Sequence, residues 1–93
     1  MTTGREVTVS AESSTSFRVE VRSDRGTTTH LVDVPPGLAE DLGWGGTDPA
    51  ELVRESFAFL LEREPPTSIL RHFSLEVISQ YFPEYPAQIR RHR

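Results

Sequence analysis

Residues 48–85 read DPAELVRESFAFLLEREPPTSILRHFSLEVISQYFPEY, and this stretch decides the fold. It opens with a strong helix start, in which Asp48 is placed to cap the helix, Pro49 takes the first helical position and Glu51 completes a capping box. Apolar residues then recur at helical spacing on a wide arc, with charged residues opposite. The residues of this arc are Leu52, Val53, Phe57, Phe59, Leu60 and Leu61. So wide an arc predicts a helix packed between a sheet and a second element.

The double proline at 65–66 is predicted to end this helix, because proline lacks an amide donor and keeps the preceding residue out of the α region. Apolar residues keep helical spacing beyond it until Pro83 stops the segment. The spacing therefore predicts helix over 67–82. This segment forms either one helix or two short helices split at Ser74, which is a suitable N-cap. Residues 87–91 predict a short C-terminal turn.

The residues before this stretch predict a sheet. Apolar and polar residues alternate over 7–11 and again over 17–21, which is the period-2 pattern of half-buried strands. A turn at 23–26, with glycine in its last position, leads into a third strand over 27–34, in which only Leu31 departs from the alternation. The prediction is an α+β fold: a three-stranded antiparallel β-meander followed by two main α-helices (β-β-β-α-α) and a short C-terminal turn.

The chain has 93 residues, which predicts one domain over 1–93 with flexible ends at 1–4 and 91–93. A core of this size is small, so association with a copy or a partner would add stability. The absence of cysteine excludes disulfides and thiolate sites and is typical of a reducing cytoplasm. No segment has the apolar length of a signal peptide or a membrane span. We therefore expect a cytoplasmic protein that does not enter a membrane.

The formal net charge is -4, and the ten basic residues are all arginine, a bias typical of GC-rich bacterial codons. The acidic balance disfavours a nucleic-acid binder, because phosphate contacts need clustered cations. His30, His72 and His92 lie far apart and lack the spacing of metal ligands. The glycine-rich stretch 43–46 lacks the lysine of a phosphate loop, and no serine has the setting of a nucleophile. We expect no catalytic residue, no metal and no cofactor, and hence no enzyme.

A longer pattern joins FAFLLEREP at 57–65, SIL at 68–70 and ISQYFPEY at 78–85. This pattern, FxFLLEREPxxSIL...YFPEY, resembles that of a group of small uncharacterised bacterial proteins. With THLV at 29–32 included, the resemblance covers roughly the last two thirds of the chain. It implies a complete single-domain bacterial protein and brings no known activity. The order of strands followed by helices is also similar in topology to antitoxins of the HicB type, although their acidic sheet motif and DNA-binding module are not evident here.

A small chain without recognisable chemistry works through its surfaces. We expect a non-enzymatic cytoplasmic module, regulatory or protein-binding, that associates with itself or with a protein partner. The residues expected to contact the partner are Trp44, Arg71, Tyr81, Tyr85, Arg90 and Arg91. Trp44 has two interpretations, as a cover over the core or as an anchor for the partner. The alternative function is an antitoxin-like or DNA-binding repressor, in which a homodimer joins two arginine-rich C-termini into one surface.

Overall fold

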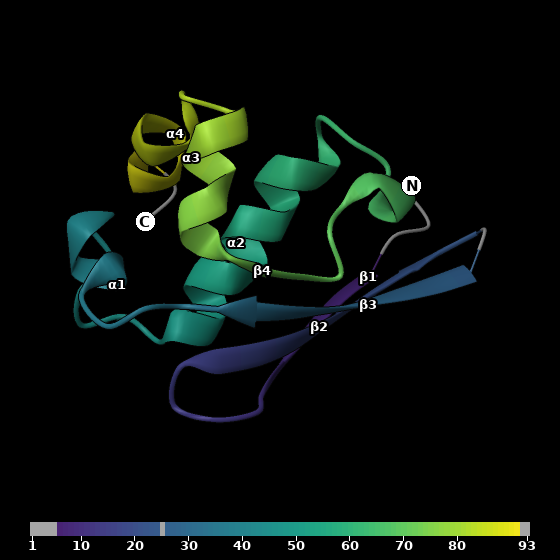
Figure 1. Cartoon of the computed structure of the whole chain (residues 1–93), viewed down its shortest axis with the longest axis horizontal. Helices are drawn as coiled ribbons and strands as arrows, with labels where there is room; N and C mark the ends of the chain where they lie inside the picture. Colours follow the sequence, from purple (N-terminus) through teal and green to yellow (C-terminus); the bar gives the residue numbers. More distant parts are fainter. Residues whose placement is uncertain (1–5, 25, 92–93) are drawn as a thin grey trace.

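The computed structural model describes residues 6–24 and 26–91, which form a sheet with helices packed on one of its faces (Figure 1). The sheet has four strands in the order β1-β2-β3-β4. Their bounds are Glu6–Ala11 (β1), Ser16–Ser23 (β2), Gly26–Asp33 (β3) and His72–Ser74 (β4). β1, β2 and β3 pair antiparallel, with Val9 opposite Val19 and Val19 opposite His30. β4 arrives from a distant part of the chain and pairs parallel to β3, with Phe73 opposite Val32.

The first three strands are those that the alternation predicts. In β2 the side chains of Phe17, Val19 and Val21 are buried, while the charged residues between them face solvent. The hairpin between β2 and β3 closes at Gly26, whose φ of 127° lies in the positive region that glycine adopts readily. One face of the sheet is therefore core, and the other is charged and open.

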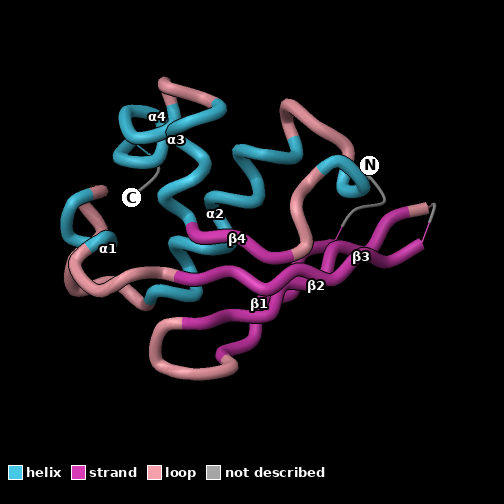
Figure 2. Tube along the Cα trace, in the orientation of Figure 1, coloured by secondary structure: helices cyan, strands magenta, loops and turns pink. Residues whose placement is uncertain are grey.

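The helices and turns lie on the apolar face of the sheet (Figure 2). Their bounds are Leu38–Asp41 (α1), Pro49–Leu61 (α2), Pro66–Ser68 (the 3-10 turn η1), Leu75–Val77 (the 3-10 turn η2), Ile78–Tyr81 (α3) and Tyr85–Arg91 (α4). The predicted start of α2 is confirmed, because the Asp48 carboxylate accepts a hydrogen bond of 3.0 Å from the N–H of Ala50. Glu51, which is predicted to complete a capping box, forms an ion pair with Arg54, and its carboxylate lies 3.9 Å from Arg54 Nε.

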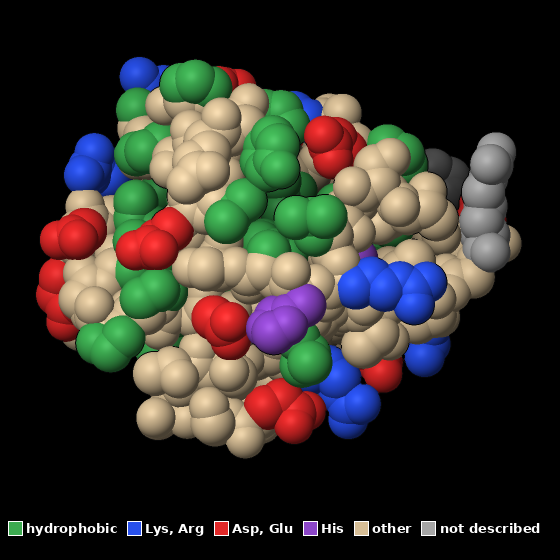
Figure 3. Space-filling view, viewed as in Figure 1, with side chains coloured by type: hydrophobic (Ala, Val, Ile, Leu, Met, Phe, Trp, Pro, Cys, Tyr) green, Lys and Arg blue, Asp and Glu red, His purple; other side chains and the backbone are tan. Residues whose placement is uncertain are grey.

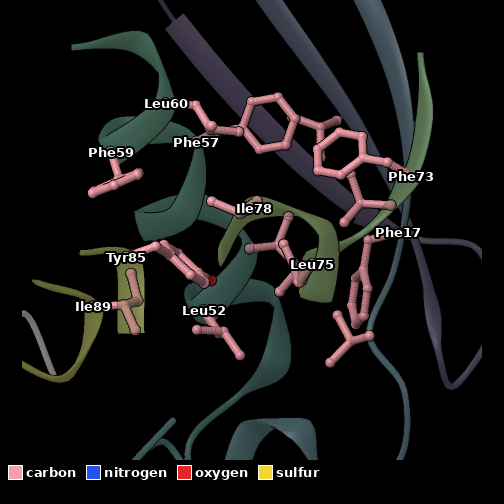
Figure 4. Packing of buried hydrophobic residues seen from close by; sticks show 14 of the residues in the cluster. Phe17, Leu52, Phe57, Phe59, Leu60, Phe73, Leu75, Ile78, Tyr85 and Ile89 are labelled. Atoms are coloured by element: carbon pink, nitrogen blue, oxygen red, sulfur yellow. The ribbon is translucent and has the colours of Figure 1, made fainter. Parts of the chain in front are cut away.

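α2 forms the centre of the core, between the sheet and α4 (Figure 4). Phe57 of α2 packs against Phe73 of β4, with ring centroids 6.0 Å apart. On another side of the helix, Phe59 packs edge-on against Tyr85 of α4 at 5.3 Å. A helix that buries side chains against two layers needs a wide apolar arc, which is the arc seen in the sequence.

The predicted meander followed by two main helices is wrong. The structure is α+β, but its sheet has four strands and is mixed, because residues 72–74 form β4 instead of helix. The backbone of Ile69 is extended, with φ -82° and ψ 134°, and the N–H of Leu31 donates to the carbonyl of Arg71 at 2.7 Å. The edge of β3 offers backbone groups to this segment, and pairing with them overrides a helical preference set by spacing alone. Ser74 does cap a helical turn, accepting from the N–H of Glu76 at 3.2 Å.

The predicted flexible ends fall largely outside the described residues, which exclude 1–5 and 92–93; Arg91 is described and ends α4. Among the residues that the structure describes, no helix is long and apolar enough to cross a membrane.

Candidate functional site

An apolar groove of about 200 Å³ opens between the end of α2, the segment that leads into β4, and the turn formed by η2 and α3. Figure 3 shows hydrophobic side chains gathered on this side of the helical layer, with charged side chains around them. The residues that line the groove are Leu60, Glu64, Ser68, Ile69, Leu70, Phe73, Val77, Ile78, Tyr81 and Phe82. Its wall therefore combines three separate segments of the second half of the chain.

The lining is chemically simple. Apart from the carboxylate of Glu64 and the hydroxyls of Ser68 and Tyr81, the side chains that line the groove are hydrocarbon. Sites for drug-sized ligands usually enclose roughly 300–1,000 Å³, whereas a cavity of about 150 Å³ already holds a benzene ring. The groove thus has room for one large apolar side chain and offers few polar groups to orient a cofactor.

Two large hydrophobic side chains stand exposed at the rim. Tyr81, the last residue of α3, is 67% exposed, and Leu70, in the extended segment before β4, is 51% exposed. The other large hydrophobic residue with high exposure among those described is Leu31, on the open face of the sheet. A groove bordered by exposed aromatic and aliphatic side chains is typical of a surface that binds another polypeptide.

His30 is buried behind the groove and supports the segment of Leu70, which forms one wall of the groove. Its Nδ1 lies 2.8 Å from the carbonyl oxygen of Leu70, its Nε2 lies 2.9 Å from the hydroxyl of Thr28, and its ring packs 5.3 Å from that of Phe57. Burial lowers the pKa of His30; the hydrogen bond to Leu70 raises it, and the charge of Arg71 lowers it further. The neutral ring therefore donates from Nδ1 to Leu70 and accepts from Thr28.

Two of the residues expected to contact a partner lie in the core. Trp44 is 4% exposed and its Nε1 donates to the carbonyl of Ile89 at 2.9 Å, so it covers the core from the loop after α1. Tyr85 is 1% exposed, and its hydroxyl lies 2.6 Å from Oγ of Ser56. Because Ser56 itself donates to the carbonyl of Leu52, Tyr85 is the donor. Trp44 thus attaches the loop after α1 to α4, Tyr85 attaches α4 to α2, and both present little surface.

The remaining expected residues fall into two places. Tyr81 lines the groove, whereas Arg71 is exposed and follows the lining residue Leu70 in the chain without lining the groove itself. Arg90 and Arg91 lie in the last turn of α4, on the side of α1, where Arg90 Nη2 donates to the carbonyl of Asp41 at 2.6 Å. The sequence pattern does not reveal the groove, because its helical spacing places Ile69 and Leu70 in a helix packed on the core.

A polar cluster of Ser16, Asp33 and His72 lies on the open face of the sheet. Ser16 Oγ donates to Asp33 at 2.9 Å, and the other carboxylate oxygen of Asp33 lies 3.2 Å from His72 Nε2. The carboxylate stands between the hydroxyl and the imidazole, so the imidazole is not placed to activate the serine.

Within 6–24 and 26–91, no three histidine, aspartate or glutamate residues gather as metal ligands. Comparisons with protein-family models, with curated proteins and with solved structures gave no match.

Proposed function

We propose that the protein is a non-enzymatic cytoplasmic module, regulatory or protein-binding, whose groove accepts a large apolar side chain of another polypeptide. The observation that carries this proposal is the apolar groove with Leu70 and Tyr81 exposed at its rim. Binding would bury these two side chains, and burial of apolar surface is the main driving force of association. The lack of cysteine supports the cytoplasmic location.

The shape and charge of the groove favour a polypeptide over other ligands. Its volume suits one side chain and falls below that of most cofactor sites. Its charged lining residue is Glu64, an acid, which disfavours the phosphates of a nucleic acid or nucleotide. A protein partner supplies both an apolar anchor for the groove and polar groups for the rim.

Retention of a partner by matched variants tests the proposal. Tagged wild-type protein, Leu70→Gln and Leu31→Gln are compared by affinity purification from host lysate and mass spectrometry, with and without nuclease. Both substitutions replace an exposed leucine, but only Leu70 lies at the groove. The wild type and Leu31→Gln should retain the same stoichiometric polypeptide after nuclease treatment, and Leu70→Gln should lose it. Equal retention by all three proteins would refute a role for the groove.

The nucleic-acid alternative rests on Arg90 and Arg91 in the last turn of α4. Arg91 is exposed, but Arg90 already donates to the carbonyl of Asp41, and the chain as a whole is acidic. This alternative predicts that DNA is recovered without a protein partner and that the recovery falls steeply with added salt. The nuclease arm of the same experiment separates the two functions.

A further inference from the structure

Two residues of opposite charge lie close to the groove: Glu64 lines it, and the exposed Arg71 follows the lining residue Leu70 in the chain. Glu64 lies next to the C-terminus of α2, where its N–H donates to the last turn of that helix at 2.9 Å. Arg71 lies next to the sheet, where its carbonyl accepts a hydrogen bond of 2.7 Å from β3. The exposed apolar residues divide in the same way. Leu70 precedes Arg71 next to the sheet, whereas Tyr81 ends α3, which runs away from the sheet (Figure 1).

This arrangement is self-complementary. A two-fold axis that crosses the middle of the groove turns one copy end for end relative to the other, as in an isologous interface. Glu64 of each copy then faces Arg71 of the other, and Tyr81 of each copy faces Leu70 of the other. One operation would thus pair both the charges and the apolar side chains. A partner of unrelated sequence would have to supply each of these groups separately.

We infer that the polypeptide that occupies the groove is a second copy of this chain, which rests on the proposed function. The Tyr81 ring of each copy covers Leu70 of the other and enters the groove, whose 200 Å³ has room for one aromatic ring. The pairs between Glu64 and Arg71 set the relative orientation of the two copies. A chain of 93 residues buries a small core, so the second copy also adds stability.

Sedimentation equilibrium of the purified full chain tests this inference. The wild type should be a dimer, and Tyr81→Ala should weaken the dimer about 100-fold through loss of two buried rings. Glu64→Arg alone and Arg71→Glu alone should each weaken it about tenfold, because each brings like charges together twice. The double variant should restore the wild-type constant within about twofold. Tyr81 is 67% exposed, so Tyr81→Ala should keep the wild-type circular dichroism. Its melting temperature should equal that of the wild type at concentrations where both chains are monomers.

The outcomes separate this inference from the function on which it rests. A wild type that stays monomeric up to about 1 mM overturns the dimer. If the lysate experiment then yields a different polypeptide that depends on Leu70, the protein-binding function stands and only the identity of the occupant is wrong. If neither a dimer nor a retained polypeptide is found, both proposals fail. A dimer that is insensitive to Tyr81→Ala and to the charge reversals uses another face, which also overturns the inference.

Discussion

His30 shows how one buried side chain connects the sheet to the groove. It belongs to β3, yet it hydrogen-bonds the carbonyl of Leu70, a residue of the groove rim forty positions later in the chain. Its ring also packs on Phe57, which packs in turn on Phe73 in the groove wall. The position of the rim therefore depends on a neutral imidazole.

Acid should destabilise the fold through His30. Its pKa in the folded protein lies below 6.5, mainly because of burial, so the unfolded chain binds the proton first as the pH falls. The stabilisation is complete above about pH 6.5 and is lost as the pH drops through the lowered pKa. Urea unfolding from about pH 7.5 to about pH 5 should show this loss in the wild type and in His72→Gln, but not in His30→Gln. A His30→Gln variant with the wild-type pH dependence would contradict this role.

Tyr85 provides a second test, at alkaline pH. Burial raises its pKa to about 12 from 10.0, although the hydrogen bond with Ser56 lowers it. The folded protein therefore holds the phenolic proton more tightly than the unfolded chain, and stability should be complete below pH 10 and fall as the pH rises toward 12. Tyr85→Phe should lose about 1 kcal/mol at neutral pH and show a smaller alkaline loss. Denaturant unfolding of both proteins at several pH values measures the two effects.

Among the elements, the segment from η1 to α3 decides whether a groove exists. The groove is lined by the end of α2, the segment that leads into β4 and the turn of η2 and α3. It therefore depends on a chain that passes through β4 and then turns back, instead of a continuous helix over 67–82. The chain turns back at Ser74, which is the last residue of β4 and the N-cap of η2. The groove is therefore a consequence of a strand and a capped turn in place of a helix.

Removal of this cap should loosen the groove wall. Ser74→Ala deletes the hydroxyl that accepts from the N–H of Glu76, and the loss of an N-cap costs about 1 kcal/mol. Ser10→Ala, on the open face of β1, is the matched control and should change the free energy of unfolding by less than about 0.5 kcal/mol. Equilibrium urea unfolding measures both. Equal effects from the two substitutions would show that the cap has no special weight.

The sequence predicts elements well where local signals act alone. The capping residues Asp48 and Pro49 place the start of α2, and alternation places the first three strands. It fails over 67–82, because apolar spacing fits both a helix and a strand followed by a capped turn. The edge of β3, which decides between them, comes from residues forty positions away. The groove depends on that choice, so no local pattern reveals it.

The same limit applies to the expected partner contacts. Trp44 and Tyr85 have the residue types of interface anchors, but Trp44 is buried against α4 and Tyr85 against α2. Tyr81 and Tyr85 lie on either side of Pro83: Tyr81 ends α3 and is exposed, whereas Tyr85 begins α4 and is buried. Whether an aromatic residue faces a partner depends on the packing of whole elements.

In the whole molecule, the helices cover one face of the sheet (Figure 1). The groove opens within this helical layer. The open face of the sheet carries charges of both signs, such as the ion pair between Arg18 and Glu12, whereas the lining of the groove is mainly apolar. Association through the groove would bury the apolar surface that the small core leaves exposed. We therefore expect Tyr81 of one copy to pack on Leu70 of another.

An isotope-filtered NOE experiment tests this claim most directly. Equal amounts of ¹³C-labelled and unlabelled chain are mixed, and only contacts between the two kinds of copy are recorded. We predict cross-peaks between the Tyr81 ring of one copy and the Leu70 methyl groups of the other, which disappear in Tyr81→Ala. Tyr81 signals that show contacts only within their own chain would contradict the account.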